Sequence, residues 1–268
     1  MDVSIIGAGR VAGNLAQALV RAGHRLRSVH NRDVQKAERV VQLAIACSRP
    51  AGGDLPRALS IVDEIPEETE CAIFCIADDA LADVIEGQSL RADLLCLHTA
   101  GSLSIDIWRG RATEYGVLYP LQTFSEATQE TAVCFKELPL FIEASDETQL
   151  ERVEQLALSL SSQVYRLNSE QRRWLHVSAV FGCNFVNSLY GAAAECLQEI
   201  GLPLSVLYGL IDETAQKVHR LSPREAQTGP ASRKDRGVMT KQMELLREKP
   251  ELQEVYRMLS ERIMGEKL

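Results

Sequence analysis

A glycine-rich turn near the start of the chain restricts the possible folds more than any other feature. It lies between the apolar run Val3–Ile6 and the amphipathic segment Val11–Ala22, and it reads Gly7-Ala8-Gly9-Arg10-Val11-Ala12-Gly13. In this G-x-G-x-x-A pattern the first glycine permits a tight turn, the second lets a pyrophosphate approach the backbone, and the alanine keeps helix and strand close. The start of the helix also offers free N–H groups to an anion. The pattern therefore predicts a dinucleotide-binding turn at residues 7–12.

Short apolar runs alternate with helix-length segments through the first half of the chain. We expect strands at 3–6, 26–30, 60–62, 71–76 and 94–98, and helices at 11–22 and 34–47. This alternation is typical of a Rossmann-type, doubly wound α/β fold with a mostly parallel sheet. Strands at 117–123 and 138–144 have little room for a crossover helix between them, so they should extend the far edge of the sheet. A helix at 148–160 and a last strand at 163–167 complete this part.

The chain after Leu167 shows no strand pattern. Helices are expected at 170–200, with Ser169 as the N-cap, and at 204–221, 232–248 and 251–264, because Gly or Pro separates these segments. The sequence thus predicts a dinucleotide-binding domain at 1–167 and an all-helical domain at 168–268. The first of these helices carries apolar or small side chains on nearly every face, which favours a homodimer formed through the helical domain.

Composition excludes several classes of function. The chain has 29 Lys and Arg against 37 Asp and Glu, a net charge of −8, and lacks a basic tract, so nucleic acid is not an expected partner. Its 7 Cys lack paired C-x-x-C spacing, which predicts reduced thiols and no metal site. No apolar stretch approaches the ~18 residues of a membrane span, and no signal-peptide pattern follows Met1. We therefore expect a cytoplasmic protein.

The end of the second strand bears on the choice of dinucleotide. An NAD site normally presents an acid there, whereas this chain has Asn31 and Arg32. Arg32, together with Lys36, can pair with a 2′-phosphate, so NADP is favoured over NAD. The alternative is that Arg32 is an ordinary surface residue and Asp33 binds the ribose of NAD.

Two later strand ends supply further candidates for cofactor binding. These are Ile76, Ala77 and Asp78 after the fourth strand, and His98, Thr99 and Ala100 after the fifth. Both lie where strands of an open sheet meet a ligand crevice, on the side expected for the nicotinamide. A buried histidine bonded to nearby backbone explains His98 equally well, so we expect it to neighbour the cofactor rather than to transfer a proton.

The long helix carries the candidate catalytic residues. His176 and Asn184 are eight positions apart, within about 80° of one another around a helix, among apolar neighbours. Such polar groups either form hydrogen bonds with one another in the core or line a ligand pocket. In the second case His176 is the acid or base and Asn184 orients the substrate. Residues 227–235 are dense in donors and form either a capped turn, a clamp for a substrate carboxylate or a dimer contact.

Five ordered motifs together resemble a known family. They are the glycine turn, LHTAGSLS (97–104), YPLQTF (119–124), LHVSAVFGCNFVNSLY (175–190) and AQTGPASRKD (226–235). The chain resembles NADP oxidoreductase-like proteins, related in name to deazaflavin-dependent NADP reductases, and more distantly pyrroline-carboxylate, ketopantoate and β-hydroxyacid reductases. The resemblance implies a dimeric nicotinamide-dependent enzyme with a 6-phosphogluconate dehydrogenase-like helical domain and a pocket between the domains. It also points to His176 and Asn184.

The chain departs from this family in a few places. Many relatives carry His at the position of Tyr119 and Ser at that of Ala100, and a His expected at Gln242 is missing. The long helix also lacks the Lys that serves β-hydroxyacid dehydrogenases as acid. The expected function is hydride transfer between NADP(H) and a small C=O or C=N substrate bound between the domains. The alternative is a sensor or interaction protein that binds NADP(H) without turnover, because a Rossmann domain implies a ligand and not a reaction.

Overall fold

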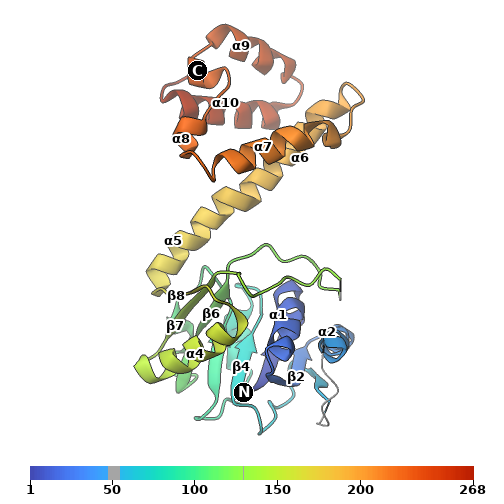
Figure 1. Cartoon of the computed structure of the whole chain (residues 1–268), viewed down its shortest axis with the longest axis vertical. Helices are drawn as coiled ribbons and strands as arrows, with labels where there is room; N and C mark the ends of the chain where they lie inside the picture. The colour runs from blue at the N-terminus through green and yellow to red at the C-terminus, as the bar shows by residue number, and fades with distance from the viewer. Residues whose placement is uncertain (48–54, 129) are drawn as a thin grey trace. The chain divides into compact units, whose positions relative to one another are not determined.

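An eight-stranded sheet organises the first part of the chain. The computed structural model describes residues 1–47, 55–128 and 130–268, and its sheet has the order β3-β2-β1-β4-β5-β6-β7-β8 (Figure 1). Strands β3 to β6 are mutually parallel, β7 runs antiparallel to β6, and β8 is parallel to β7. The strands are β1 Asp2–Ile6, β2 Arg25–Asn31, β3 Arg57–Ser60, β4 Cys71–Phe74, β5 Leu95–His98, β6 Glu114–Pro120, β7 Leu140–Ala144 and β8 Val164–Arg166.

Helices cover both faces of this sheet. On one face α1 (Arg10–Arg21), α2 (Val34–Cys47) and α4 (Glu147–Leu160) share one apolar cluster with the strands. On the other face α3 (Leu81–Glu86) and the 3₁₀ helix Ile105–Trp108 build a second cluster around the fully buried Trp108. Strands β1, β4 and β5 are buried along their whole length, as expected for parallel strands covered on both sides. The predicted doubly wound α/β fold is therefore confirmed.

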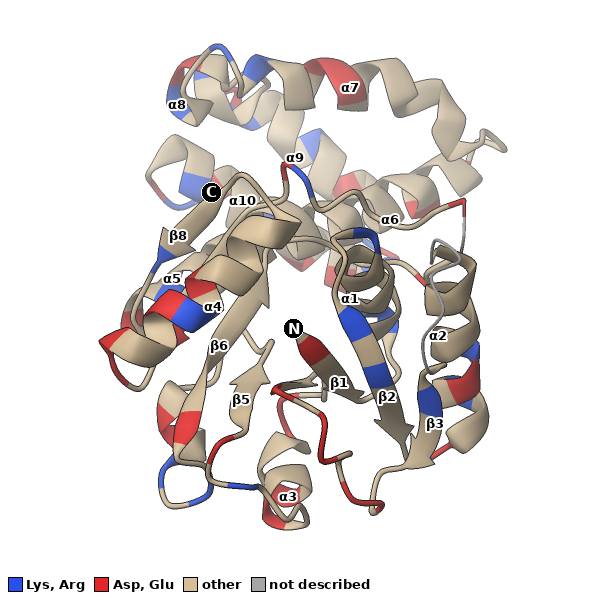
Figure 2. Ribbon diagram, turned by 60° about the horizontal axis from the view of Figure 1, so that its bottom comes forward, with Lys and Arg blue, Asp and Glu red and all other residues tan. Residues whose placement is uncertain are grey.

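The outer face of α4 shows how charge is distributed on this unit. Acidic residues and one Arg lie along α4 (Figure 2), and Arg166 of β8 pairs with Glu147 at 2.9 Å and Glu154 at 2.7 Å. All seven cysteines are free thiols. In the part of the chain that the structure describes, no helix is long and apolar enough to cross a membrane.

The segment after β8 is helical, as predicted, but its first helix differs in detail. It comprises α5 (Ser169–Ala179), a π-helical turn at Val180–Asn184 and α6 (Phe185–Gln198). Asn168, not Ser169, is the N-cap: its side chain accepts from Gln171 N at 2.8 Å, and the Gln171 side chain accepts in return from Asn168 N. The expected role of Ser169 was therefore wrong, because the Ser169 hydroxyl binds Glu143 instead.

The chain divides into two compact units, Met1–Cys183 and Asn184–Leu268. The second unit contains α6, the 3₁₀ helix Leu204–Leu207, α7 (Tyr208–Lys217), α8 (Pro223–Ala226), the 3₁₀ turn Ala231–Arg233, α9 (Arg236–Leu245) and α10 (Pro250–Met264). Its small core joins Ala231, Met239 and Met264. The first unit includes α5, so it extends beyond the domain boundary expected at Leu167, which stays a prediction.

Candidate functional site

The glycine turn lies where the strand order reverses between β1 and β4. Gly7 has a φ of +110°, and a Cβ there would lie 2.3 Å from the carbonyl oxygen of Cys75. Gly7 N donates to His30 O at 2.7 Å and Cys75 N donates to Ile6 O at 2.7 Å, so the turn is wedged between β2 and β4. Position 7 therefore accepts only glycine.

Gly9 differs from Gly7 in its surroundings. A Cβ at Gly9 would meet nothing within 4 Å, which leaves open space above the backbone. Gly9 is the N-cap of α1, where no side chain caps the helix and the first turn has no acid. The first N–H groups of α1 and the positive end of its dipole therefore remain available to an anion.

A cleft of about 930 Å³ adjoins the glycine turn. Gly9 and Arg10 line one side of it, Lys36 and Arg39 of α2 line another, and residues 126–128 form a third wall. Three basic side chains thus border the space next to the start of α1. Glu38 and Glu126 also reach it, so its charge is mixed.

The end of β2 is organised by short-range hydrogen bonds. Asn31 Nδ2 donates to Asp33 O at 3.0 Å, and Asp33 Oδ1 accepts from Gln35 N at 3.1 Å. The Asp33 carboxylate is therefore engaged at the start of α2. Arg32 is exposed.

The loops after β4 and β5 are joined to each other. Thr99 N donates to Phe74 O at 3.2 Å, and the Ser102 hydroxyl donates to the carboxylate of Asp78. Ile76 approaches the glycine turn, since its Cδ1 would lie 3.1 Å from a Cβ at Gly7. Ala77 accepts from Ala80 N at 3.0 Å, and Ala100 is nearly buried. These predicted residues therefore gather near the carboxyl ends of β1, β4 and β5.

His98 belongs to the core rather than to an open surface. Its side chain is fully buried, its Nδ1 accepts from Ala100 N at 3.2 Å, and its ring stacks on Trp108 with centroids 6.3 Å apart. Burial, with the positive Arg172 adding to the effect, lowers the pKa of His98 to about 3. The ring is therefore neutral near pH 7, as the buried-histidine interpretation of the sequence expects.

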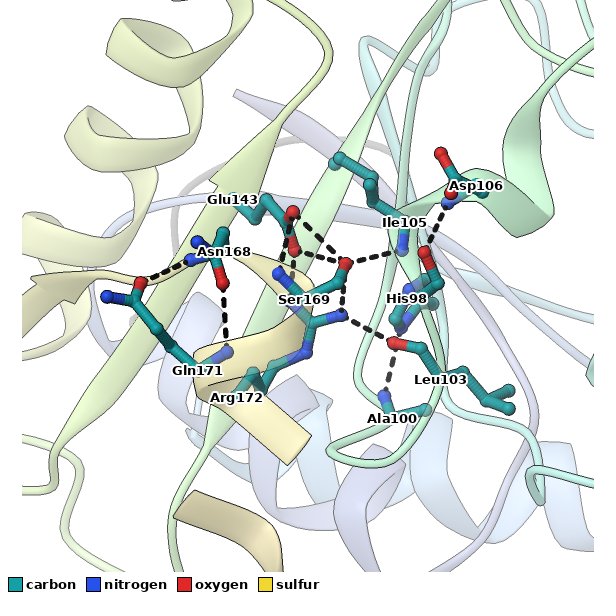
Figure 3. A network of polar contacts seen from close by, with 12 residues as sticks. His98, Ala100, Leu103, Ile105, Asp106, Glu143, Asn168, Ser169, Gln171 and Arg172 are labelled. Carbon is teal, nitrogen blue, oxygen red and sulfur yellow. Dashed lines mark hydrogen bonds and ion pairs between the residues drawn. The ribbon is translucent and has the colours of Figure 1, made fainter. Parts of the chain in front are cut away.

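A buried ion pair fixes α5 to the sheet. Arg172, whose side chain is 1% exposed, pairs with Glu143 of β7 and donates from Nη2 to Leu103 O at 2.5 Å. Ser169 Oγ donates to Glu143 at 2.8 Å and accepts from Ile105 N at 2.9 Å. Figure 3 shows Arg172 reaching from α5 between Glu143 and the loop after β5. These contacts determine where the next turn of α5 lies.

His176 lies one turn beyond Arg172, beside Tyr119 of β6. The Tyr119 Oη and His176 Nδ1 atoms are 3.1 Å apart, with ring centroids at 6.0 Å and planes at 66°. Burial raises the pKa of the Tyr119 phenol, and the negative Asp78 adds to this effect. A Cβ at Gly101 would lie 2.6 Å from His176 Nδ1 and 2.8 Å from Tyr119 Cζ, so this pair fits only against a glycine.

The remaining candidates belong to the second unit. Asn184 begins the second unit, so its expected role beside His176 stays a prediction. Within residues 227–235, Asp235 Oδ1 accepts from Val238 N at 3.1 Å and caps α9, and Ser232 Oγ donates to Gly229 O at 2.9 Å. These bonds favour the capped turn among the three interpretations of that segment. Among the described residues, no group of three or more His, Cys, Asp or Glu is arranged to hold a metal ion.

Comparisons with known proteins agree with this architecture. Residues 138–263 match a family described as a domain of unknown function, DUF2520. A comparison with curated proteins finds no match. A Plasmodium falciparum pyrroline carboxylate reductase with NADP bound, at 11% identity, covers 99% of this chain and 97% of its own with a TM-score of 0.57. An Aspergillus terreus reductive aminase in complex with NADPH, at 15% identity, covers 91% and 77% with a TM-score of 0.61. These two share the fold.

A solved structure from Bacteroides fragilis is more similar. It is described as a "putative NADP oxidoreductase", is 39% identical, covers 98% of both chains and has a TM-score of 0.86. Identity at this level over nearly the whole length reflects common descent and not a shared fold alone. This chain belongs to the same NADP oxidoreductase-like family as the Bacteroides fragilis protein.

Proposed function

We propose that this protein is an NADP(H)-dependent oxidoreductase that transfers a hydride between nicotinamide and a small C=O or C=N substrate. The observation that carries the proposal is the glycine turn. Gly7 has a positive φ and lies too close to Cys75 O for any side chain, and Gly9 leaves the backbone open beside the uncapped start of α1. This combination suits a pyrophosphate, because free N–H groups and open space coincide.

The residues around the turn also fit the remainder of the cofactor. Arg10 and Lys36 border the adjoining cleft. Arg32 lies in the short connection between β2, the strand next to the glycine turn, and α2. A guanidinium binds phosphate through two parallel N–H bonds, so Arg32 with Lys36 suits the 2′-phosphate. One oxygen of the Asp33 carboxylate already accepts from Gln35 N at the start of α2, which argues against the NAD alternative. NADPH held there would supply the hydride.

The protein's part in the chemistry is to supply and place a proton. His176 is half-buried and is held against the end of β6, on the same edge of the sheet as the glycine turn. A substrate that gains a hydride at carbon needs a proton at oxygen or nitrogen, and an imidazole can deliver it. Asn184 remains the proposed orienting residue. The seven free thiols support a cytoplasmic location.

A calorimetric titration with NADPH and then NADH tests the cofactor assignment. Arg32→Ala should weaken NADPH by about tenfold or more and leave NADH nearly unchanged, because one charge-assisted pair to phosphate contributes about 1.5–3 kcal/mol. Arg109→Ala is the matched control, since Arg109 pairs with Asp106 on the far face. Equal weakening of both dinucleotides by Arg32→Ala would contradict the 2′-phosphate assignment.

A turnover assay distinguishes an enzyme from a sensor that binds NADP(H) without turnover. NADPH oxidation is followed by absorbance with 1-pyrroline and pyruvate as C=N and C=O probes, in the wild type and in His176→Ala. Oxidation that depends on His176 supports the enzyme. Tight NADPH binding without oxidation of either probe, and with ligand-induced changes elsewhere in the chain, favours the sensor.

A further inference from the structure

A tyrosine hydroxyl determines how the His176 ring is presented. Among the residues that the structure describes, Tyr119 is the only hydrogen-bond partner of this ring, and the bond is made to Nδ1 at 3.1 Å. The second ring nitrogen, Nε2, is left for other partners. The two side chains come from β6 and α5, 57 positions apart in the sequence.

Both rings are held from several sides. Tyr119 is paired with Phe141 of β7 in the antiparallel register, and their ring centroids are 6.3 Å apart. His176 follows Arg172 by one helical turn, and the buried ion pair of Arg172 with Glu143 fixes α5 against the same strand β7. Gly101 closes the remaining side, because its missing Cβ is what makes room for the contact.

The chemistry of the pair favours one direction for the hydrogen bond. A phenol is a stronger donor than it is an acceptor, and the unprotonated nitrogen of a neutral imidazole is a good acceptor. Burial and Asp78 raise the pKa of the Tyr119 phenol, so it keeps its proton across the physiological range.

We propose that Tyr119 is a positioning residue that donates its hydroxyl proton to His176 Nδ1, so that neutral His176 carries its own proton on Nε2, the nitrogen presented to a substrate. This rests on the proposed function for its catalytic meaning. In a reduction the charged imidazolium gives its Nε2 proton to the substrate oxygen or nitrogen. The N–H electron pair stays on Nε2 as a lone pair and Nδ1 keeps its proton, so the ring that leaves this step is transiently the neutral Nδ1-protonated form. Solvent then returns a proton to Nε2 and regenerates the imidazolium. The Tyr119 hydroxyl accepts from Nδ1 in both of these states and donates to Nδ1 only in the resting neutral ring, so the ring stays in place throughout.

Nitrogen-15 NMR tests the hydrogen bond without a substrate. The chain has 5 His, and His176→Gln identifies the signals of His176. Above about pH 8, where an ordinary imidazole is neutral, we expect Nε2 to be protonated and Nδ1 to be unprotonated in the wild type. Tyr119→Phe should allow a measurable Nδ1-protonated population. A wild-type proton on Nδ1, or identical spectra for Tyr119→Phe, would overturn the proposal.

Two further variants separate this role from a general loss of structure. Tyr165→Phe removes a hydroxyl from β8 and should leave the His176 signals unchanged. Gly101→Ala keeps both rings but forces them apart, so it should reproduce the spectrum of Tyr119→Phe. Thermal unfolding confirms that each variant is folded, and a Gly101→Ala spectrum identical to that of the wild type would contradict the proposed geometry.

A turnover measurement tests the catalytic meaning. With whichever of 1-pyrroline and pyruvate is reduced, Tyr119→Phe should lower kcat about ten- to a hundredfold, part of what a general acid supplies, with the KM for NADPH unchanged. The double variant Tyr119→Phe/His176→Ala should be no slower than His176→Ala alone, because both changes disrupt the same Tyr119–His176 pair. Additive losses would show that Tyr119 acts independently. If NADPH does not bind at all, the proposed function fails while the NMR result still decides the hydrogen bond.

Discussion

Single residues show how burial defines chemical state in this protein. His30 and His98 lie near the carboxyl ends of β2 and β5, and both are fully buried. His30 Nδ1 donates to Ser60 O at 3.3 Å, and His30 Nε2 shares a hydrogen bond with Ser28 Oγ at 2.8 Å. Burial lowers the pKa of each ring, to about 3 for His98. Both histidines are therefore neutral groups of the core near pH 7.

The burial of His30 and His98 predicts that the folded protein loses stability in acid. Because their folded pKa values lie below the ordinary 6.5, the unfolded chain binds more protons as the pH falls. Their contribution to the free energy of unfolding is therefore fully present above about pH 6.5. It is lost as the pH falls toward their folded pKa values, by up to ~1.4 kcal/mol per pH unit for each ring. Urea unfolding at pH 7.5 and pH 5.5 measures this. His98→Asn should reduce the pH dependence, whereas His219→Asn on the exposed surface should not; equal slopes in all three proteins would be inconsistent with buried neutral rings.

At the scale of elements, a long connection is clamped onto α1. Residues 121–139 join β6 to β7, and the buried Asn14 binds this segment at two places. Its Nδ2 donates to Ser125 O at 3.2 Å, and its Oδ1 accepts from Val133 N at 2.9 Å. Figure 1 shows this connection passing from β6 toward α1. The clamp holds residues 126–128 as a wall of the cleft beside the glycine turn.

Removing the clamp should loosen that wall. Asn14→Ala leaves Val133 N and Ser125 O without their partner, which costs about 1–3 kcal/mol when such groups are buried. Urea unfolding measures the loss, and limited proteolysis should cut the variant faster within 121–139. The matched change Asn187→Ala, at an exposed position of α6, should alter neither. Resistance of Asn14→Ala to proteolysis at the wild-type level would contradict the clamp.

The elements were predictable where one physical pattern dominates. Alternating apolar runs and amphipathic segments defined β1, α1, β2 and α2, because parallel strands are buried on both faces. The short α3 and the 3₁₀ helix at Ile105–Trp108 were missed, since pieces of four to six residues carry no periodicity. The Asn168 cap was missed in favour of its neighbour because both residue types cap helices equally well.

The site was only partly predictable for a similar reason. The glycine turn is a local pattern, so Gly7 and Gly9 were identified from sequence alone. Tyr119 was noted only as a departure from relatives, and the Arg172–Glu143 pair was not foreseen, because both contacts join segments far apart in the chain. The spacing of four between Arg172 and His176 was the one available signal, since it puts them on the same helix face.

At the scale of the whole molecule, the apolar helices α6 and α7 lie outside the small core of the second unit. No side chain of α6 or α7 is buried, and the apolar side chains of Leu189 in α6 and Leu210 in α7 are 38% and 65% exposed. A folded monomer seldom leaves this much apolar helix surface in contact with water. We therefore propose that α6 and α7 are covered by a second copy of the chain.

Sedimentation equilibrium tests this assembly. The wild type should have the mass of two chains at micromolar concentration. Leu189→Asp with Leu210→Asp should shift it toward one chain, because a charge in an apolar interface is strongly unfavourable. Leu158→Asp, on the exposed side of α4 in the first unit, is the control and should stay dimeric. A monomeric wild type would contradict the proposal.

The central claim is that the glycine turn binds NADP(H), and one calorimetric comparison tests it most directly. Gly9→Ala puts a methyl group into open space, so the variant should unfold like the wild type, while NADPH binding should fall about tenfold or more because the backbone can no longer be approached. Gly7→Ala, by contrast, should lose both stability and binding, because its Cβ meets Cys75 O. Undiminished NADPH binding by a folded Gly9→Ala would contradict the account.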